Sequence, residues 1–183
     1  NITIGAFRAP RSNFNAAAEQ SFLDELAEAM GKDPIEFRLE LLKRAKENPV
    51  GKNNEYDADR YAAVLTLVKE KSGWNNPENK KYSRGVAAYF CHNSYAAHVV
   101  DMVKKDGKPV VEKVTSAIDC GIVINPDAAS NMVQGAVVDG IGNALYGAQT
   151  FNNGKPAKNN FTTYRMIRHR EAPRQIDVHF VQN

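Results

Sequence analysis

The chain has 183 residues, 43% of them hydrophobic, which is enough for one compact domain or two small layers that share a core. The formal net charge of +3 is mild, and lysines and arginines alternate with acids along the chain, so no nucleic-acid-binding stripe is predicted. No apolar run approaches the roughly 20 residues that span a bilayer, so no transmembrane segment is expected.

Cys91 and Cys120 lie far apart without C-x-x-C spacing, so we expect two buried free thiols and no disulfide framework. The chain starts at Asn1 with neither an initiator Met nor a signal peptide, which suggests a piece of a longer protein. Any export signal would precede Asn1, so a cytoplasmic and a periplasmic location both stay open.

Residues 1–82 are predicted to be a helical segment, in which an extended entry and a loop at residues 1–12 precede the helices. A helix over residues 13–30 is predicted from an apolar stripe, which consists of Phe14, Phe22, Leu23, Leu26 and Met30. Gly31 ends this helix, Asp33-Pro34 starts a second one, and Asp57 caps a third.

After Ser83 the period of the hydrophobic residues changes to two, which is typical of strands. Strands are predicted at 85–90, 96–103, 110–118, 149–151, 161–166 and 176–181, with a hairpin turn at Asp106-Gly107. The predicted fold class is α+β: helices in residues 1–82, then in residues 83–183 a mostly antiparallel sheet with a glycine-rich helix packed on it. We expect the two segments to form one compact unit.

The glycine-rich helix follows the triplet Asn125-Pro126-Asp127, which fits a helix start with Asn as the cap and Pro at the first position. Gly135, Gly140 and Gly142 lie inside it, and each costs about 1 kcal/mol relative to Ala. Two interpretations stay open. The glycines allow tight packing of the helix on the sheet, or they leave bare backbone that a flat ligand can approach.

The common catalytic patterns are not present. The four histidines have no metal-ligand spacing, no serine stands in a G-x-S-x-G context, and neither a P-loop nor a dinucleotide-binding fingerprint occurs. His98 and His179 are interpreted as ordinary sheet residues.

Two stretches are more specific. The first is Gly5-Ala6-Phe7-Arg8-Ala9-Pro10, followed by Asn13-Phe14 and a helix that continues into Gly31-Lys32-Asp33-Pro34. The second is Asp119-Cys120-Gly121, Asn125-Pro126-Asp127 and the helix that ends in Ala144-Leu145-Tyr146-Gly147. In order and spacing they resemble the molybdenum hydroxylases, the large subunits of the xanthine dehydrogenase and aldehyde oxidase family. The most similar subgroup is the isoquinoline 1-oxidoreductase β-subunits.

The resemblance implies a molybdopterin cofactor with molybdenum, often as the cytosine dinucleotide. It implies an oxidoreductase that hydroxylates an electron-poor carbon of an N-heteroaromatic ring or an aldehyde, with oxygen from water. Electrons would leave through a small partner subunit that carries two [2Fe–2S] clusters. The sequence does not identify the substrate.

Candidate cofactor-binding residues follow from the same resemblance. The family's Phe-Arg loop corresponds to Phe7 and Arg8, with Ala9 next to them, and the cofactor-facing helix corresponds to Met132, Gln134 and Gly135. Backbone amides, small residues and an arginine fork suit a pterin and its phosphates.

This chain departs from the family pattern at several positions. Many relatives carry Gln-x-Glu-Gly at the helix, whereas Met132 stands here in place of the Gln and Gln134 in place of the Glu, and Arg11 replaces a Gly. The family's catalytic glutamate lies outside this chain, so we assign no catalytic residue and no metal ligand, and we expect the isolated chain to be inactive. The alternative is a degenerate, non-catalytic module of the same fold that serves subunit interaction.

Overall fold

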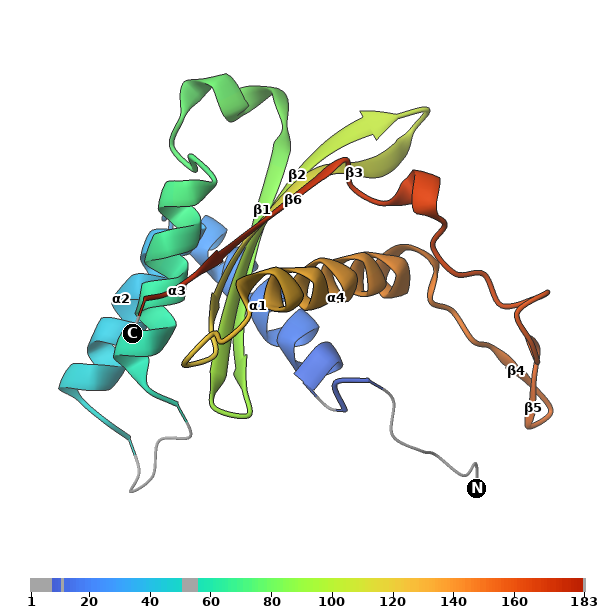
Figure 1. Cartoon of the computed structure of the whole chain (residues 1–183), viewed down its shortest axis with the longest axis horizontal. Coiled ribbons are helices and arrows are strands. Elements are labelled where there is room, and N and C mark those ends of the chain that lie inside the picture. Colours follow the sequence, from blue (N-terminus) through green and yellow to red (C-terminus); the bar gives the residue numbers. More distant parts are fainter. Residues whose placement is uncertain (1–7, 11, 51–55, 183) are drawn as a thin grey trace.

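The computed structural model describes residues 8–10, 12–50 and 56–182, and Figure 1 shows their arrangement. Three helices come first: α1 (Ser12–Ala29), α2 (Pro34–Glu47) and α3 (Ala58–Lys71). Asp33 and Asp57 cap the second and the third, because each carboxylate accepts hydrogen bonds from two backbone N–H groups of the first turn. The predicted starts of both helices are confirmed.

Four strands form the main sheet in the spatial order β1-β2-β3-β6, with bounds Ser83–Cys91, Ser94–Lys105, Lys108–Asp119 and Gln175–Phe180. β2 is antiparallel to both β1 and β3, and β6 runs parallel to β3. Asp106 and Gly107 form the predicted hairpin turn, with positive φ angles of 50° and 77°. The predicted α+β class with a mostly antiparallel sheet is confirmed.

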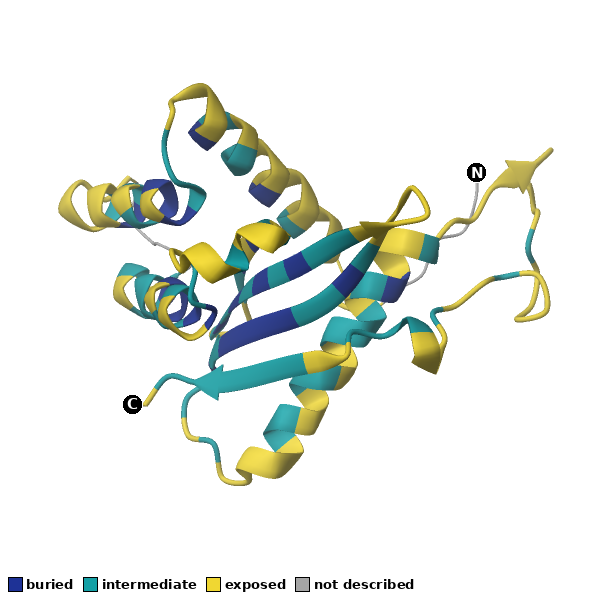
Figure 2. Cartoon of the chain, turned by 90° about the horizontal axis from the view of Figure 1, so that it is seen from above, coloured by how far each residue is buried: buried dark blue, intermediate teal, exposed yellow. Residues whose placement is uncertain are grey.

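The fourth helix, α4 (Pro126–Tyr146), follows β3 and lies on the opposite side of the sheet from α2 and α3 (Figures 1 and 2). It packs along the edge strand β6. The chain then forms an extended arm before it returns as β6. The arm and the α3–β1 connection contain short elements: β4 (Phe151–Asn152), β5 (Lys155–Pro156), η2 (His169–Glu171) and η1 (Pro77–Lys81).

The hydrophobic core lies between the sheet and helices α2 and α3. Ile35, Val64 and Val68 of the helices pack there against Val99 and Ala117 of the sheet, and all five are at most 1% exposed. Side chains from residues 1–82 and from 83–183 therefore share one core. Burying them supplies most of the stability that orders the sheet on which α4 rests.

Two arginines fasten the ends of α3 to the sheet. Arg60, in the first turn of α3, donates hydrogen bonds to both carboxylate oxygens of Asp119 at the end of β3, at 2.9 and 2.7 Å. Arg84 of β1 donates to the Ser72 carbonyl at the other end of the helix (2.8 Å) and to Asp101 of β2 (2.6 Å). Since both carboxylates are buried, each needs its arginine to offset the cost of burying the charge.

Some expectations from the sequence are wrong. Residues 161–166 do not form a strand: residues 161–163 form a turn, because the Asn160 side chain accepts a hydrogen bond from the Thr162 N–H. Cys91 and Cys120 are free but exposed: Cys91 is the last residue of β1, and Cys120 directly follows β3. The predicted apolar stripe of α1 is only partly covered: Leu23 and Leu26 are half-buried, whereas Phe14, Phe22 and Met30 are more than half exposed.

Candidate functional site

Helix α4 starts as the sequence predicts. Asn125 is the cap residue, its side-chain oxygen accepts a hydrogen bond from the Ala128 N–H at 3.0 Å, and Pro126 occupies the first helical position. The helix is 21 residues long, yet Gly142 is its one buried residue. No helix in the described part of the chain combines the length and the apolar character needed to cross a membrane.

The two sides of α4 differ in what they contact. The Gln134 amide points toward the sheet and donates a hydrogen bond to the Ile176 carbonyl of β6, at 3.2 Å. Met132, Gly135 and Ala136 are exposed, and the Met132 residue keeps 77% of its surface accessible. Of the three α4 residues predicted to bind a cofactor, Met132 and Gly135 therefore lie on the outer surface, whereas Gln134 helps to hold α4 against β6.

The three interior glycines have different structural reasons. At Gly142 a Cβ atom would lie 2.9 Å from Ile167 Cγ2, so close packing of the arm against the helix requires a residue without a side chain. At Gly135 and Gly140 a Cβ atom would meet nothing within 4 Å. Tight packing thus explains Gly142, and the other two leave open helix backbone that nothing in the described chain covers.

The N-terminal segment reaches α4 through an ion pair. Arg8 Nη1 lies 3.0 Å from Asp139 Oδ2, with the Arg8 side chain 71% exposed and that of Asp139 29% exposed. Ala9 has a φ of 55°, an uncommon conformation for a residue with a side chain, and its carbonyl accepts a hydrogen bond from the Asn13 N–H. The ion pair brings two segments that lie 131 residues apart to one surface.

The structure therefore joins three of the predicted residues. Arg8, Met132 and Gly135 share the outer side of α4, and the exposed Ala9 adjoins Arg8. Phe7 lies outside the described residues. Sequence reasoning missed Asp139, which anchors the arginine, although an acid one helical turn after Gly135 was a usable signal.

The Asp119-Cys120-Gly121 motif has a structural role in the described chain. Asp119 binds Arg60, as described above, and its Oδ1 also accepts a hydrogen bond from the Gly121 N–H at 3.2 Å. Gly121 has a φ of 77°, which suits glycine and redirects the chain from β3 toward α4. The motif thus sets where α4 begins, and no local pattern indicated that Arg60 would bind it.

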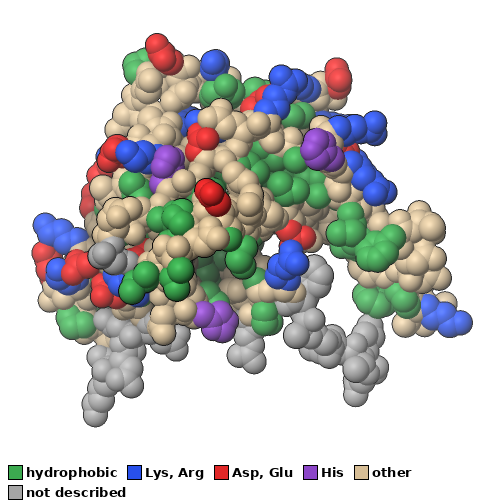
Figure 3. All heavy atoms as spheres, in the orientation of Figure 1, with side chains coloured by type: hydrophobic (Ala, Val, Ile, Leu, Met, Phe, Trp, Pro, Cys, Tyr) green, Lys and Arg blue, Asp and Glu red, His purple; other side chains and the backbone are tan. Residues whose placement is uncertain are grey.

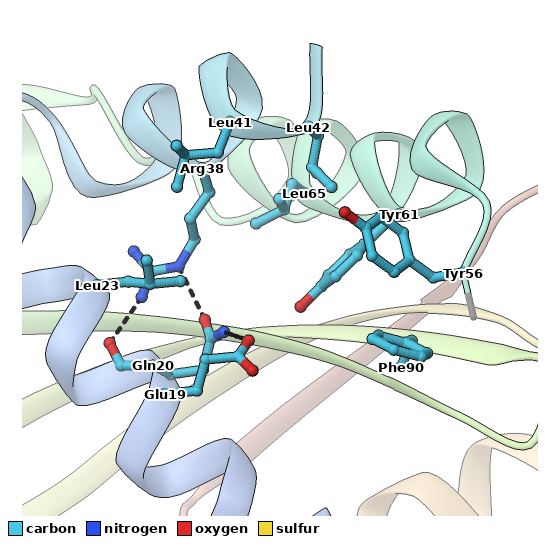
Figure 4. A pocket seen from close by; sticks show the side chains of 10 residues that line it. All are labelled: Glu19, Gln20, Leu23, Arg38, Leu41, Leu42, Tyr56, Tyr61, Leu65 and Phe90. Atoms are coloured by element: carbon cyan, nitrogen blue, oxygen red, sulfur yellow. Dashed lines mark hydrogen bonds between the residues drawn. The ribbon is translucent and has the colours of Figure 1, made fainter. Parts of the chain in front are cut away.

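A pocket of about 260 Å³ lies among α1, α2, α3 and β1, on the side of the sheet away from α4 (Figure 4). The buried Arg38 donates to Gln20 Oε1 at 2.8 Å, and the same oxygen accepts the Ala88 N–H of edge strand β1. Tyr61 donates to the Ala88 carbonyl at 2.6 Å, and burial raises the pKa of its phenol. These groups satisfy the Ala88 N–H and C=O on the open edge of β1, so residues that line the pocket also have a structural role.

The histidines of the sheet behave as predicted from their strand positions. His98 Nδ1 lies 2.8 Å from Ser116 Oγ on the neighbouring strand, and burial lowers the pKa of His98 to about 4, so the ring is neutral at pH 7. Among the described residues, no three His, Cys, Asp or Glu side chains are arranged to hold a metal ion.

Comparison with known proteins identifies the class. Residues 16–173 match the family described as "Molybdopterin cofactor-binding domain", and the chain belongs to that family. The resemblance seen in the sequence is thereby confirmed.

Two relatives align over nearly the whole chain. A membrane-bound aldehyde dehydrogenase [pyrroloquinoline-quinone] of Gluconacetobacter polyoxogenes is 27% identical over 97% of this chain and 24% of its own length. The β-subunit of isoquinoline 1-oxidoreductase of Brevundimonas diminuta is 28% identical over 90% of this chain and 20% of its own length.

A third relative is a nicotinate dehydrogenase subunit of Pseudomonas putida, which is 26% identical over 90% of this chain and 14% of its own length. The chain therefore spans a quarter or less of the length of these relatives. Two of the three are named as subunits.

Proposed function

We propose that this chain forms part of the cofactor-binding region of a molybdenum-dependent oxidoreductase. The observation that carries the proposal is the open backbone at Gly135 and Gly140, beside an anchored arginine, in a chain of the molybdopterin cofactor-binding family. The names of its relatives support an oxidoreductase as the parent protein.

The residues on the outer side of α4 fit such a group. Open helix backbone and small side chains let a flat ring system approach closely, and the exposed guanidinium of Arg8 has donors left for a phosphate or another charged oxygen. We assign Arg8 and Ala9, and with them Phe7, to one side of the cofactor and the Met132–Gly135 turn to the other. Gln134, on the side of α4 that faces the sheet, would contribute by fixing the helix on β6.

The reaction we propose for the parent is hydroxylation of an N-heteroaromatic or aldehyde carbon with oxygen from water. The bound cofactor, a molybdopterin that could carry a cytosine dinucleotide, would supply the redox centre that takes two electrons from the substrate. The residues of this chain would bind and orient the cofactor. The partner that receives the electrons would be a small iron–sulfur subunit.

The isolated chain would not turn over substrate, since we assign no catalytic group to it. Met132 cannot supply the amide that many relatives place at its position, so this residue would contact the cofactor through its thioether or through its backbone.

The test is the molybdenum content of the full-length parent, co-expressed with its iron–sulfur subunit. Near-stoichiometric molybdenum with a releasable pterin is expected. Folded parent without molybdenum, from a host that loads related enzymes, would favour the alternative of a non-catalytic module that serves subunit interaction. Because one relative is named for pyrroloquinoline quinone, the quinone should be measured in the same extract. Quinone in place of molybdenum would refute the proposal.

A further inference from the structure

The positive charge of the chain is concentrated in two short segments. Residues 104–113 and 165–174 hold eight of the 24 lysines and arginines but three of the 21 acids. The remaining residues, with 16 basic and 18 acidic side chains, are slightly negative. This concentration of charge was not evident in the sequence, where basic residues looked evenly mixed with acids, because the two segments lie far apart along the chain.

The fold brings the two segments together at one end of the sheet. The first forms the β2–β3 hairpin and the second contains η2 and leads into β6 (Figure 1). The Arg174 N–H donates a hydrogen bond to the Glu112 carbonyl at 3.1 Å, and Lys113 pairs in register with Gln175. We call this end the basic surface; it consists of Lys104, Lys105, Lys108, Lys113, Arg165, Arg168, Arg170 and Arg174.

The side chains of the basic surface differ in whether a nearby acid pairs with them. Lys105, Lys113 and Arg165 form ion pairs with nearby acids. Lys108, Arg170 and Arg174, in contrast, are exposed and make no ion pair within the part of the chain that the structure describes. Figure 3 shows lysine and arginine side chains gathered over this end of the molecule, at the upper right.

The composition of the surface favours a protein as its partner. Asp106, Glu112 and Glu171 interrupt the positive charge, which would disfavour the continuous negative charge of a nucleic-acid backbone. The adjoining arm exposes Phe161 and Met166, which are 76% and 44% accessible. Apolar side chains flanked by arginines are typical of protein interfaces.

We propose that the basic surface docks an acidic face of a second subunit and steers the association of the two proteins. The partner we assign is the iron–sulfur subunit, and in that respect the inference rests on the proposed function. Attraction between opposite charges speeds association and falls as salt increases, because ions screen exposed charges over about 10 Å at 0.1 M.

The experiment compares three forms of the full-length parent for their affinity toward the purified iron–sulfur subunit at several NaCl concentrations. One variant combines Lys108→Glu, Arg170→Glu and Arg174→Glu. The matched control applies the same change of charge on the helical side of the molecule, with Lys43→Glu, Arg44→Glu and Lys80→Glu. Thermal melts and the iron content of the partner check folding, and a glutamine version of the first variant gives a milder change if the reversal does not fold.

We expect the reversal on the basic surface to weaken binding about tenfold or more at low salt and to flatten its salt dependence. The control should bind like the wild type. Equal affinity of all three proteins, or failure of the wild type to bind the iron–sulfur partner, would overturn the inference. The inference would also be overturned if the variant kept its affinity for the iron–sulfur subunit but lost binding to a random DNA duplex or to anionic vesicles. Molybdenum content is measured separately, so a loaded enzyme whose reversal variant binds the partner unchanged would refute this inference and leave the proposed function standing.

Discussion

The three glycines of α4 predict opposite effects of the same substitution. Replacing Gly135 or Gly140 by Ala removes the conformational freedom of glycine from the unfolded chain and adds a methyl group that meets nothing. Each change should therefore raise the free energy of unfolding by about 0.5–1 kcal/mol. For a chain of this size, that corresponds to an increase in Tm of roughly 1–4 °C.

Gly142→Ala is the matched comparison. Its new Cβ atom would lie 2.9 and 3.2 Å from two carbons of the Ile167 side chain, so the arm must shift. Overpacking of this kind costs about 1–3 kcal/mol, which outweighs the gain in helix propensity. Gly142→Ala should therefore lower the free energy of unfolding.

Urea unfolding of the isolated chain, followed by far-ultraviolet circular dichroism, measures all three variants. The functional measurement is the molybdenum content of the full-length parent with the same substitutions. We expect Gly135→Ala to lower it, because the added methyl group occupies the surface that we assign to the cofactor. A destabilised Gly135→Ala chain would show that the open backbone is covered. Unchanged molybdenum in the parent would remove Gly135 from the proposed site.

Four further predictions concern other parts of the chain. Arg60→Ala deprives the buried Asp119 carboxylate of its arginine and should cost about 3 kcal/mol in urea unfolding, whereas a cost below about 1 kcal/mol would show that this ion pair contributes little. The pKa of His98 falls to about 4 in the folded state, so the unfolded chain binds more protons than the folded chain between pH 4 and 6.5. The free energy of unfolding should therefore rise with pH across that range and level off above it. His98→Gln should flatten this rise. Asp139→Asn breaks an exposed ion pair and should change the free energy of unfolding by less than about 1 kcal/mol. It should nevertheless lower the molybdenum content of the parent, because Arg8 loses its ion-pair partner. Normal molybdenum content would contradict this role of Asp139. The isolated chain should self-associate through its exposed apolar side chains, so that its mass by light scattering rises with concentration; a constant monomer mass would argue against this.

The features that could be predicted from the sequence are those that local interactions determine. Asp33, Asp57 and Asn125 cap helices because a short polar side chain reaches the N–H groups of the next turn whatever the rest of the fold does. The Asp106-Gly107 turn follows from the positive φ angles that these residue types accept. These signals, together with the change in hydrophobic period, were sufficient for the fold class.

The features that could not be predicted depend on contacts between distant residues. Nothing near Arg60 indicates that it will bind a carboxylate 59 residues further on, and nothing near Arg8 indicates Asp139. The stripe of α1 shows the limit of periodicity, since it identifies an apolar face and does not say what covers it. The predicted strand at 161–166 failed because a side-chain turn at Asn160 was stronger than the β-propensity of the residues that follow.

Helix α4 connects the fold to the proposed function through its interior glycines. Three interior glycines cost it about 3 kcal/mol in helix propensity. The half-buried residues that pack along β6, the hydrogen bond of Gln134 and the ion pair of Asp139 act against that cost. A group that binds the outer side of α4 in the folded state alone would stabilise the helix in proportion to its affinity. Under the proposed function, Gly135 and Gly140 lower the stability of the empty domain and leave the backbone accessible, and binding of the cofactor would offset that loss of stability.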